Sequence, residues 1–282
     1  MLRSMLDLKN YTIGATDGEV GHVSDFFFDD RGWIIRYLVI ETGSWLLSRK
    51  VLLSPFALME ADWTHKRLPV RITREQVKNS PDIDTQQPVS RQHEINHSDY
   101  YGYPYYWGGE GIWGDGLDVP MLMSPGYSGS MRNEAAKTKE RKNHSKNNNH
   151  RPPAPPATLT AGDPHLRSCE SVIGHRIHAN DGDMGHVQSM LVDEESWAIR
   201  YLVVKTGSWW GNHALIAPDQ VLIAPDWLTE INWQDSTVRV DLTCQNIKDS
   251  PRFDSSATLN RQIEADLFRH YGRPAYWDHA GE

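Results

Sequence analysis

The chain has 282 residues and a formal net charge of −8, and 39% of its residues are apolar. This length exceeds that of a usual single domain, so two domains are expected. The acidic balance argues against a protein that binds nucleic acid over its whole surface. No stretch approaches the roughly 18 uninterrupted apolar residues of a membrane helix, and the first residues lack the apolar run of a secretory signal. We therefore expect a cytoplasmic protein with no integral membrane segment.

The same sequence blocks occur twice in the chain. TIGATDGEVGHVSDFFFDDRGWIIRYLVIETGSWL, from Thr12, matches RIHANDGDMGHVQSMLVDEESWAIRYLVVKTGSWW, from Arg176, without a gap. A later block, SRQHEINHSDYYGYPYYW from Ser90, matches NRQIEADLFRHYGRPAYW from Asn260. The offset grows from 164 to 170 between the blocks, and we place the extra residues in the loop around APDWLTEINWQD. The repeat predicts two similar domains, at residues 8–107 and 169–277.

Each copy begins with a predicted hairpin and continues with a strand that is apolar on both faces. The Asp-Gly pair of ATDGEV marks a tight turn, and the next turn falls at Asp29 to Gly32. In the strand from Trp33 to Glu41, apolar residues point both ways, which predicts that both faces are covered. One cover is the interior of a small barrel, and the other is a helix, a second domain or a partner. Shorter strands are predicted at RKVLLSP, LPVRIT, ALIAP and TVRVDLT.

A helix is predicted after these strands. TLNRQIEADLFRHYG has Asn260 as its N-terminal cap and Gly272 as its end, with Ile263 and Leu267 on one face. The corresponding VSRQHEINHSDYYG of the first copy is far more polar, so it predicts a weaker helix. Both copies then end on the pattern YG-x-P-x-YW, which we interpret as an aromatic plug that packs against a sheet.

The segment between the copies, residues 108–168, differs in composition from both. It is rich in glycine, then basic, then rich in proline, and it predicts a disordered linker because it cannot bury enough apolar surface to offset its ordering entropy. Residues 132–151 contain seven Lys or Arg and two Glu. One interpretation is a solvated spacer, and the other is a weak, salt-sensitive tether for RNA, the ribosome or another anionic partner.

The ordered motifs resemble the PRC-barrel family. They are a Gly-x-Val strand after an Asp-Gly turn, then W-x-I-R-Y-L-V-V-x-T-G-S-W, then VLLSP or ALIAP, then RQ-x-E and YG-x-P-x-YW. The family is named after the H subunit of the photosynthetic reaction centre, and a ribosome-maturation factor carries a related barrel. The resemblance implies a mainly β protein with two small PRC-type β-barrels, each followed by a short helix, and a role in protein–protein docking without chemistry of its own. The trailing motif is typical of free-standing bacterial members.

The residues that recur in both copies suggest few reactive sites. His22 and His186 are weak candidates for ligand or metal binding, because they are the only histidines that recur at matching positions of the two copies. Arg36 and Arg200 lie within an apolar strand, so each charge must be paired or reach the surface along its side chain. Asp25, Asp29, Glu94 and Glu264 are available acids, and we expect an ion pair or a hydrogen bond to a turn rather than anion binding. G-x-S-x-G does not occur. H-E-x-x-H occurs once, as HEINH from His93 to His97, and the second copy has IEADL at the matching positions, so the motif does not recur. We therefore predict no catalytic residues, no metal site and no cofactor.

The favoured hypothesis is a non-catalytic adaptor that binds a protein partner, with its two copies packed as an intramolecular pseudo-dimer or otherwise self-associating. The candidate interaction surface consists of repeated aromatic and arginine residues, namely Trp33, Arg36, Trp45, Trp107, Trp197, Arg200, Trp209 and Trp277. One alternative is a protein that senses a metal or a small ligand. A weaker alternative is a factor that associates with RNA or the ribosome through its basic linker.

Overall fold

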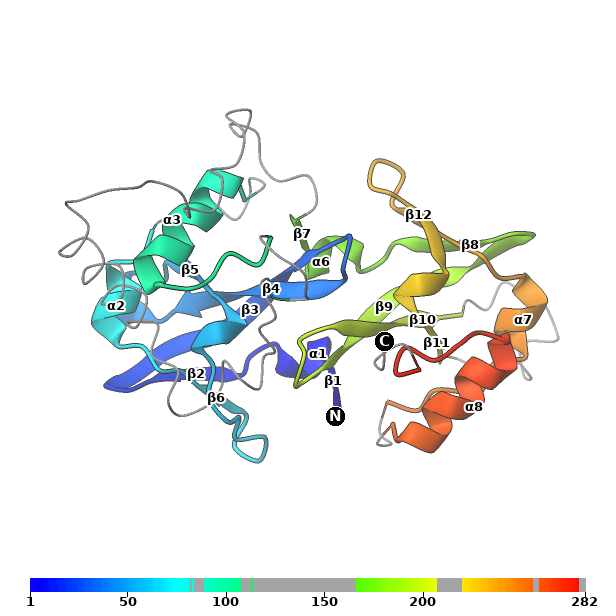
Figure 1. Ribbon diagram of the computed structural model, residues 1–282, viewed down its shortest axis with the longest axis horizontal. Coiled ribbons are helices and arrows are strands. Elements are labelled where there is room, and N and C mark those ends of the chain that lie inside the picture. The colour runs from blue at the N-terminus through cyan, green and yellow to red at the C-terminus, as the bar shows by residue number, and fades with distance from the viewer. Residues whose placement is uncertain are drawn as a thin grey trace, which may run out of the picture. The chain divides into compact units, whose positions relative to one another are not determined.

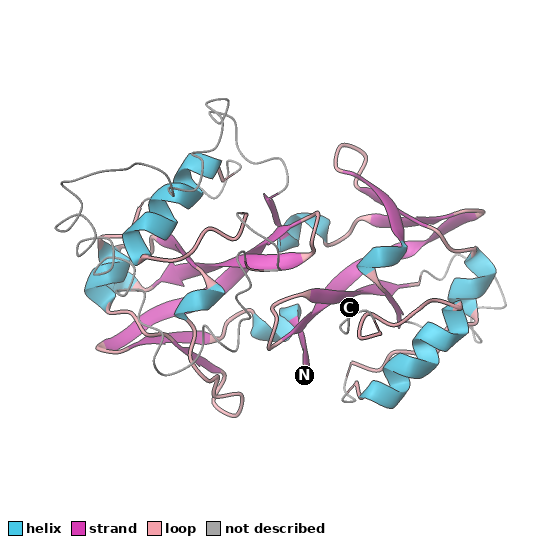
Figure 2. Cartoon of the chain, viewed as in Figure 1, coloured by secondary structure: helices cyan, strands magenta, loops and turns pink. Residues whose placement is uncertain are grey.

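A computed structural model describes residues 1–81, 83, 89–107, 113, 166–206, 220–255 and 259–278. These residues are mainly β, with two mixed sheets and a few helices (Figure 2), which confirms the predicted class. They divide into two compact modules. The N-terminal module consists of Leu8–Ser168 and Glu195–Trp197, and the C-terminal module consists of Met1–Asp7, Cys169–Glu194 and Ala198–Glu282. Among the described residues, no helix combines the length and apolar character needed to cross a bilayer.

The sheet of the N-terminal module has the strand order β5-β4-β3-β2-β6, and β7 pairs with β3 (Figure 1). Neighbouring strands are antiparallel except β2 and β6, which are parallel. The strands are β2 (Thr12–Ala15), β3 (Gly18–Asp29), β4 (Ile34–Thr42), β5 (Lys50–Leu53), β6 (Arg67–Pro69) and β7 (Leu166–Ser168). The helices are α2 (Arg74–Lys78) and α3 (Arg91–Tyr101), with 3-10 turns at Ser44–Leu46 and Pro55–Ala57.

The sheet of the C-terminal module has the corresponding order β11-β10-β9-β8-β13-β12, and β1 pairs with β9. The parallel pair here is β8 with β13. The strands are β1 (Leu2–Ser4), β8 (Arg176–Ala179), β9 (Gly182–Asp193), β10 (Ile199–Lys205), β11 (Gln220–Ile223), β12 (Leu228–Asn232) and β13 (Thr237–Val240). The helices are α6 (Cys169–Val172), α7 (Cys244–Lys248) and α8 (Arg261–Tyr271), with a 3-10 turn at Pro225–Trp227. Helix α1 (Met5–Leu8) spans the point where the chain leaves this module.

The two predicted hairpins of the first copy form, and β4, the strand that follows the second turn, is covered on both faces. Every residue of β4 from Ile34 to Ile40 is buried, as the apolar pattern predicted. The pairing of β9 with β10 requires glycine at position 185, whose φ is +120°. A Cβ atom there would lie 2.1 Å from the carbonyl oxygen of Lys205, on the neighbouring strand. Gly21 meets Glu41 in the same way, which explains why this glycine recurs in both copies.

The extra residues of the second copy lie earlier in the chain than the sequence suggested. Leu38 pairs with Leu53, and its counterpart Leu202 pairs with Ile223. The offset therefore already reaches 170 at β11, before the loop around APDWLTEINWQD begins. The placement of the insertion in that loop is wrong, and the added residues fall between β10 and β11. The strand predicted at ALIAP, residues 214–218, lies outside the described residues, and the counterpart of VLLSP is VLIAP, from Val221.

Both predicted helices form with the same length and the same ends. Asn260 caps α8 by accepting a bond from the backbone N–H of Ile263, and Gly272 ends it in the left-handed conformation, which confirms the predicted boundaries. Ser90 and Gly102 do the same for α3. Helix α3 is therefore as long as α8, although its sequence is more polar. Its buried face carries polar side chains that find partners on the sheet.

One strand of each module comes from outside the predicted domain boundaries. Strand β1 precedes the first copy in sequence, yet it pairs with β9 of the second copy. Strand β7 immediately precedes the second copy, yet it pairs with β3 of the first. In the N-terminal module, the long strand β3 pairs along one edge first with β2 and then with β7. In the C-terminal module, the long strand β9 pairs in the same way with β8 and then with β1. The predicted linker, residues 108–168, lies outside the described residues except for Trp113 and Leu166–Ser168.

Candidate functional site

A buried carboxylate organises the N-terminal module. Glu94 of α3 has an exposed fraction of 0%. Its Oε1 accepts hydrogen bonds from the hydroxyl of Tyr37 on β4, at 3.3 Å, and from that of Tyr106 in the segment after α3, at 2.5 Å. Its Oε2 lies 2.9 Å from Nη1 of Arg91, one helical turn earlier. The carboxylate thus connects a strand, a helix and the segment that ends the copy.

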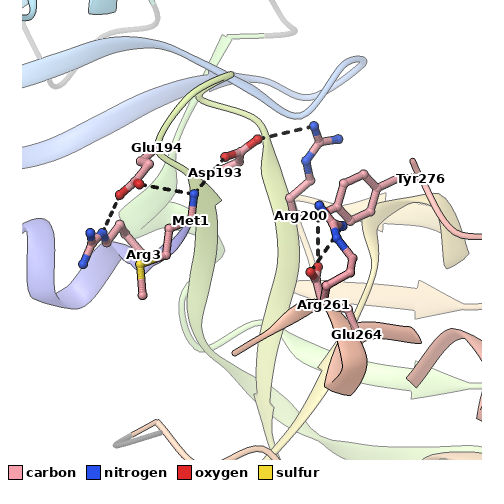
Figure 3. A network of polar contacts seen from close by, with 8 residues as sticks. All are labelled: Met1, Arg3, Asp193, Glu194, Arg200, Arg261, Glu264 and Tyr276. Carbon is pink, nitrogen blue, oxygen red and sulfur yellow. Dashed lines mark hydrogen bonds and ion pairs between the residues drawn. The ribbon is translucent and has the colours of Figure 1, made fainter. Parts of the chain in front are cut away.

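The C-terminal module repeats this arrangement at the matching positions. Glu264 of α8 is 4% exposed, and its Oε1 accepts bonds from the hydroxyls of Tyr201, at 2.9 Å, and Tyr276, at 3.0 Å. Nη1 of Arg261 lies 3.3 Å from its Oε2 and also donates to the Tyr276 hydroxyl, at 3.0 Å. Figure 3 shows Arg261, Glu264 and Tyr276 together, beside Arg200 from β10. We call each set of one glutamate, two tyrosines and one arginine a glutamate–tyrosine cluster.

The tyrosines of the clusters remain neutral over a wide pH range. Burial, followed by the negative charge of Glu94, raises the pKa of Tyr37 and the pKa of Tyr106 well above their usual value. Burial also raises the pKa of Tyr201, and it raises the pKa of Tyr276 to about 12. A neutral phenol donates one hydrogen bond, and here that bond goes to the carboxylate. The arrangement is suited to holding three segments together.

Cations and aromatic rings extend each cluster. The guanidinium of Arg36 lies 4.0 Å from the ring centre of Tyr106, and that of Arg200 lies 4.2 Å from the ring centre of Tyr276. Arg36 also forms the predicted ion pair, 3.2 Å from Asp29, one of the four acids considered, and burial lowers its pKa. Arg200 lies 3.7 Å from Asp193, an acid that was not considered (Figure 3). Such cation–π contacts contribute about 0.5–2 kcal/mol each.

The tryptophan at the end of each copy also has an arginine guanidinium over its ring. Arg91 lies 4.1 Å from the ring centre of Trp107, and Arg261 lies 4.1 Å from that of Trp277. Both tryptophans are half-buried. The cationic side chain therefore covers part of each indole and leaves part of it accessible to solvent. The predicted aromatic plug has its Tyr directed inward and its Trp at the rim.

The other residues of the candidate interaction surface occupy different environments. Trp33 and Trp197 are buried, at 9% and 2% exposure, and both have a positive φ, of 55° and 60°. Trp45 is half-buried, donates to the carbonyl of Val20 at 2.7 Å, and lies under the guanidinium of Arg74. Trp209 lies outside the described residues.

The repeated histidines lie on the solvent side of their strands. His22 and His186 are both exposed, and the nearest acidic atom recorded for His22 is Oε2 of Glu41, at 3.9 Å. Within the described part of the chain, no group of three or more His, Cys, Asp or Glu side chains is arranged to hold a metal ion. Cys169 and Cys244 are both buried free thiols.

The sequence indicates the glutamates of the clusters only as possible partners for Arg36 and Arg200. Its local patterns do not show that Arg91, Arg261, Tyr106 and Tyr276 belong to a polar network. The signal was present in the sequence, since Arg and Glu recur three residues apart and a Tyr-Trp pair recurs twelve residues after that Glu in both copies. No protein-family model matches this sequence, and no curated protein matches it.

Proposed function

We propose that each copy is a PRC-type barrel and that the chain is a non-catalytic adaptor that binds a protein partner. The observation that carries this proposal is the use of the repeated polar residues. In both modules, the same glutamate, tyrosines and arginines bond to one another across a strand, a helix and the terminal segment. Both copies therefore share a polar cluster that joins the strand, the helix and the terminal segment, together with one partly exposed tryptophan beside this cluster.

The chemistry of the cluster supports a structural role. Both oxygens of Glu94 have partners within the module, and the phenols that bond to it stay protonated because burial raises their pKa. A general acid or base needs a pKa near the working pH and access to a substrate. Glu94 is fully buried, so a substrate would have to displace the tyrosines to reach it.

The rim of the cluster supports a docking role. Trp107 and Trp277 occupy matching positions, and each is half-buried beside an arginine that fixes one side of its ring. Tryptophan and arginine are enriched among the residues that dominate binding energy at protein interfaces. Because the rings are already held in place, binding through them loses little conformational entropy. A chain with two such rims can engage two sites of a partner.

Affinity capture from the native host with a reversible crosslinker tests this proposal. We expect the tagged chain to enrich a protein partner that the Trp107→Ala, Trp277→Ala double variant recovers at least tenfold less. Met59→Ala is the matched control, because Met59 is an exposed apolar residue outside the clusters, and it should recover the partner as the parent chain does. Circular dichroism establishes that the variants are folded. Recovery that does not depend on the tryptophans contradicts the proposed surface.

Thermal melting in the presence of divalent metals and anionic metabolites tests the alternative, a sensor of metals or small ligands. A ligand that binds only the folded state raises the unfolding midpoint. The adaptor proposal predicts no rise across the panel. A saturable rise that disappears in the His22→Ala, His186→Ala variant would instead identify a sensor of metals or small ligands.

A further inference from the structure

The sequence Leu-Arg-Ser occurs at residues 2–4 and again at residues 166–168, and both occurrences form strands. Each strand begins 10 residues before the first repeated block of its own copy, which starts at Thr12 or Arg176. Each one nevertheless pairs with the long strand of the other copy. Leu2, Arg3 and Ser4 lie opposite Asp193, Val192 and Leu191, whereas Leu166, Arg167 and Ser168 lie opposite Asp29, Phe28 and Phe27.

Side-chain contacts fix β1 on β9. Nε of Arg3 lies 2.7 Å from Oε2 of Glu194, and the amino group of Met1 lies 3.3 Å from Oε1 of the same residue (Figure 3). The hydroxyl oxygens of Ser4 and Ser189 are 3.4 Å apart. The backbone N–H of Glu194 donates to the carbonyl of Met1, at 3.0 Å. Both backbone hydrogen bonds and side-chain contacts at residues 3 and 4 therefore fix β1 on β9.

Matching contacts fix β7 on β3. Nε of Arg167 lies 3.2 Å from Oδ2 of Asp30, the counterpart of Glu194, and the hydroxyl of Ser168 donates to Asp25 at 2.5 Å. Leu166 is 4% exposed and belongs to a hydrophobic core cluster of the N-terminal module, with Phe27, Tyr37, Val39, Leu52 and Val89. Removing this strand would open that core and expose one edge of β3, which is costly because an unpaired edge carries unsatisfied backbone groups.

We propose that the edges of β3 and β9 are docking sites for the Leu-Arg-Ser strand of another copy of the module. The partner that fits each site is therefore a second copy, and pairing by reciprocal strand donation does not require the covalent link between the copies. Strand addition of this kind derives affinity from the main chain and specificity from the side chains, here an arginine that meets an acidic residue. The inference concerns how copies pair, and it holds whether or not the modules bind a further protein.

Cutting the full chain tests the proposal. A recognition sequence for a specific protease is inserted between residues 140 and 141, and the folded protein is digested. We expect the two fragments to elute together on size exclusion at micromolar concentration, with the mass of the intact chain by light scattering. Separation of the fragments into two monomers would overturn the proposal.

Cysteine pairs then determine which strand occupies which edge. In the cleavable chain, Ser4→Cys with Ser189→Cys should form a disulfide that joins the two fragments on a denaturing, non-reducing gel. Ser4→Cys with Asp25→Cys is the matched alternative, because Asp25 bonds to Ser168, the counterpart of Ser4. If each strand stayed with its own copy, this second pair would form instead, within one fragment. That result overturns the proposal, and so does the formation of neither disulfide. The single Ser4→Cys variant controls for the native thiols.

Charge reversal tests the specificity of the docking site. Arg3→Glu should raise the dissociation constant of the cut fragments at least tenfold, because it places a third acid beside Asp193 and Glu194. Adding Glu194→Arg should restore most of the affinity. Arg239→Glu is the matched control, since Arg239 pairs with Glu230, at 3.4 Å, within one copy. Equal effects of Arg3→Glu and Arg239→Glu would count against a docking role for this strand.

Discussion

Replacing His97 with leucine removes a buried imidazole whose proton affinity changes on folding. His97 is 2% exposed, its Nε2 lies 3.1 Å from the carbonyl oxygen of Leu52, and its ring meets that of Tyr37 edge-on. Burial lowers its pKa from 6.5 to about 4. Leu267 occupies the matching position of the second copy, so the chain itself shows that leucine fits at this place in the fold.

The size and sign of the effect follow from this shift in pKa. Between pH 6.5 and pH 4, the unfolded chain binds a proton at this residue and the folded chain does not. Above pH 6.5, protonation of His97 therefore takes nothing from the free energy of unfolding. Below pH 6.5, it lowers this free energy by about 1.4 kcal/mol for each unit of pH, until the folded state also protonates near pH 4. The total loss is about 3 kcal/mol. At pH 7, the variant loses the bond to Leu52 and is destabilised by about 1–3 kcal/mol.

Urea unfolding of both proteins from pH 7 to pH 4.5 measures the prediction. We expect the free energy of unfolding of the variant to gain about 2.7 kcal/mol relative to the parent chain over this range. His22→Leu, which replaces an exposed histidine, should show no such gain. If the His97→Leu variant and the parent chain have parallel pH dependence, His97 does not fold as a buried neutral group, and the reasoning is refuted.

Three further results are expected from substitutions and thiol chemistry. Tyr106→Phe should lower the free energy of unfolding in urea by about 1–3 kcal/mol, because a buried carboxylate loses a donor. Tyr105→Phe should change it little, because that hydroxyl bonds at the exposed surface, and equal losses would refute the cluster. Gly185→Ala should cost more than about 2 kcal/mol because its Cβ meets the backbone of β10, and Gly272→Ala, with open space, about 1 kcal/mol; the reverse order contradicts the pairing. Burial raises the pKa of Cys244 to about 11, so iodoacetamide at pH 8 should alkylate it at least tenfold more slowly than a cysteine in a short peptide, and equal rates would show it to be accessible.

The local structure of each copy could be predicted because the determining residues lie close together in the sequence. The Asp-Gly turn, the doubly buried strand β4 and the ends of α8 follow from short patterns of turn, apolar and capping residues. The polar sequence of α3 concealed a helix of equal length, because Glu94 and His97 are buried against partners that only the tertiary structure supplies. A helical pattern counts such residues as exposed.

The strand exchange could not be predicted from sequence. Leu-Arg-Ser recurs at the same offset as the first repeated block, so the repeat was detectable. Because the two receiving strands are equivalent, however, the sequence does not state which of them accepts which donor. The position of the insertion was missed for a related reason, since an ungapped match does not show which strands pair, and only the pairing of Leu202 with Ile223 places it.

Nuclear Overhauser effects from the first strand test most directly whether each copy completes the sheet of the other. In a deuterated, selectively labelled chain, the strand exchange predicts backbone contacts between Arg3 and Val192 and between Arg167 and Phe28. Contacts between Arg3 and Phe28, together with contacts between Arg167 and Val192, would show that each strand stays with its own copy, and they would contradict the exchange.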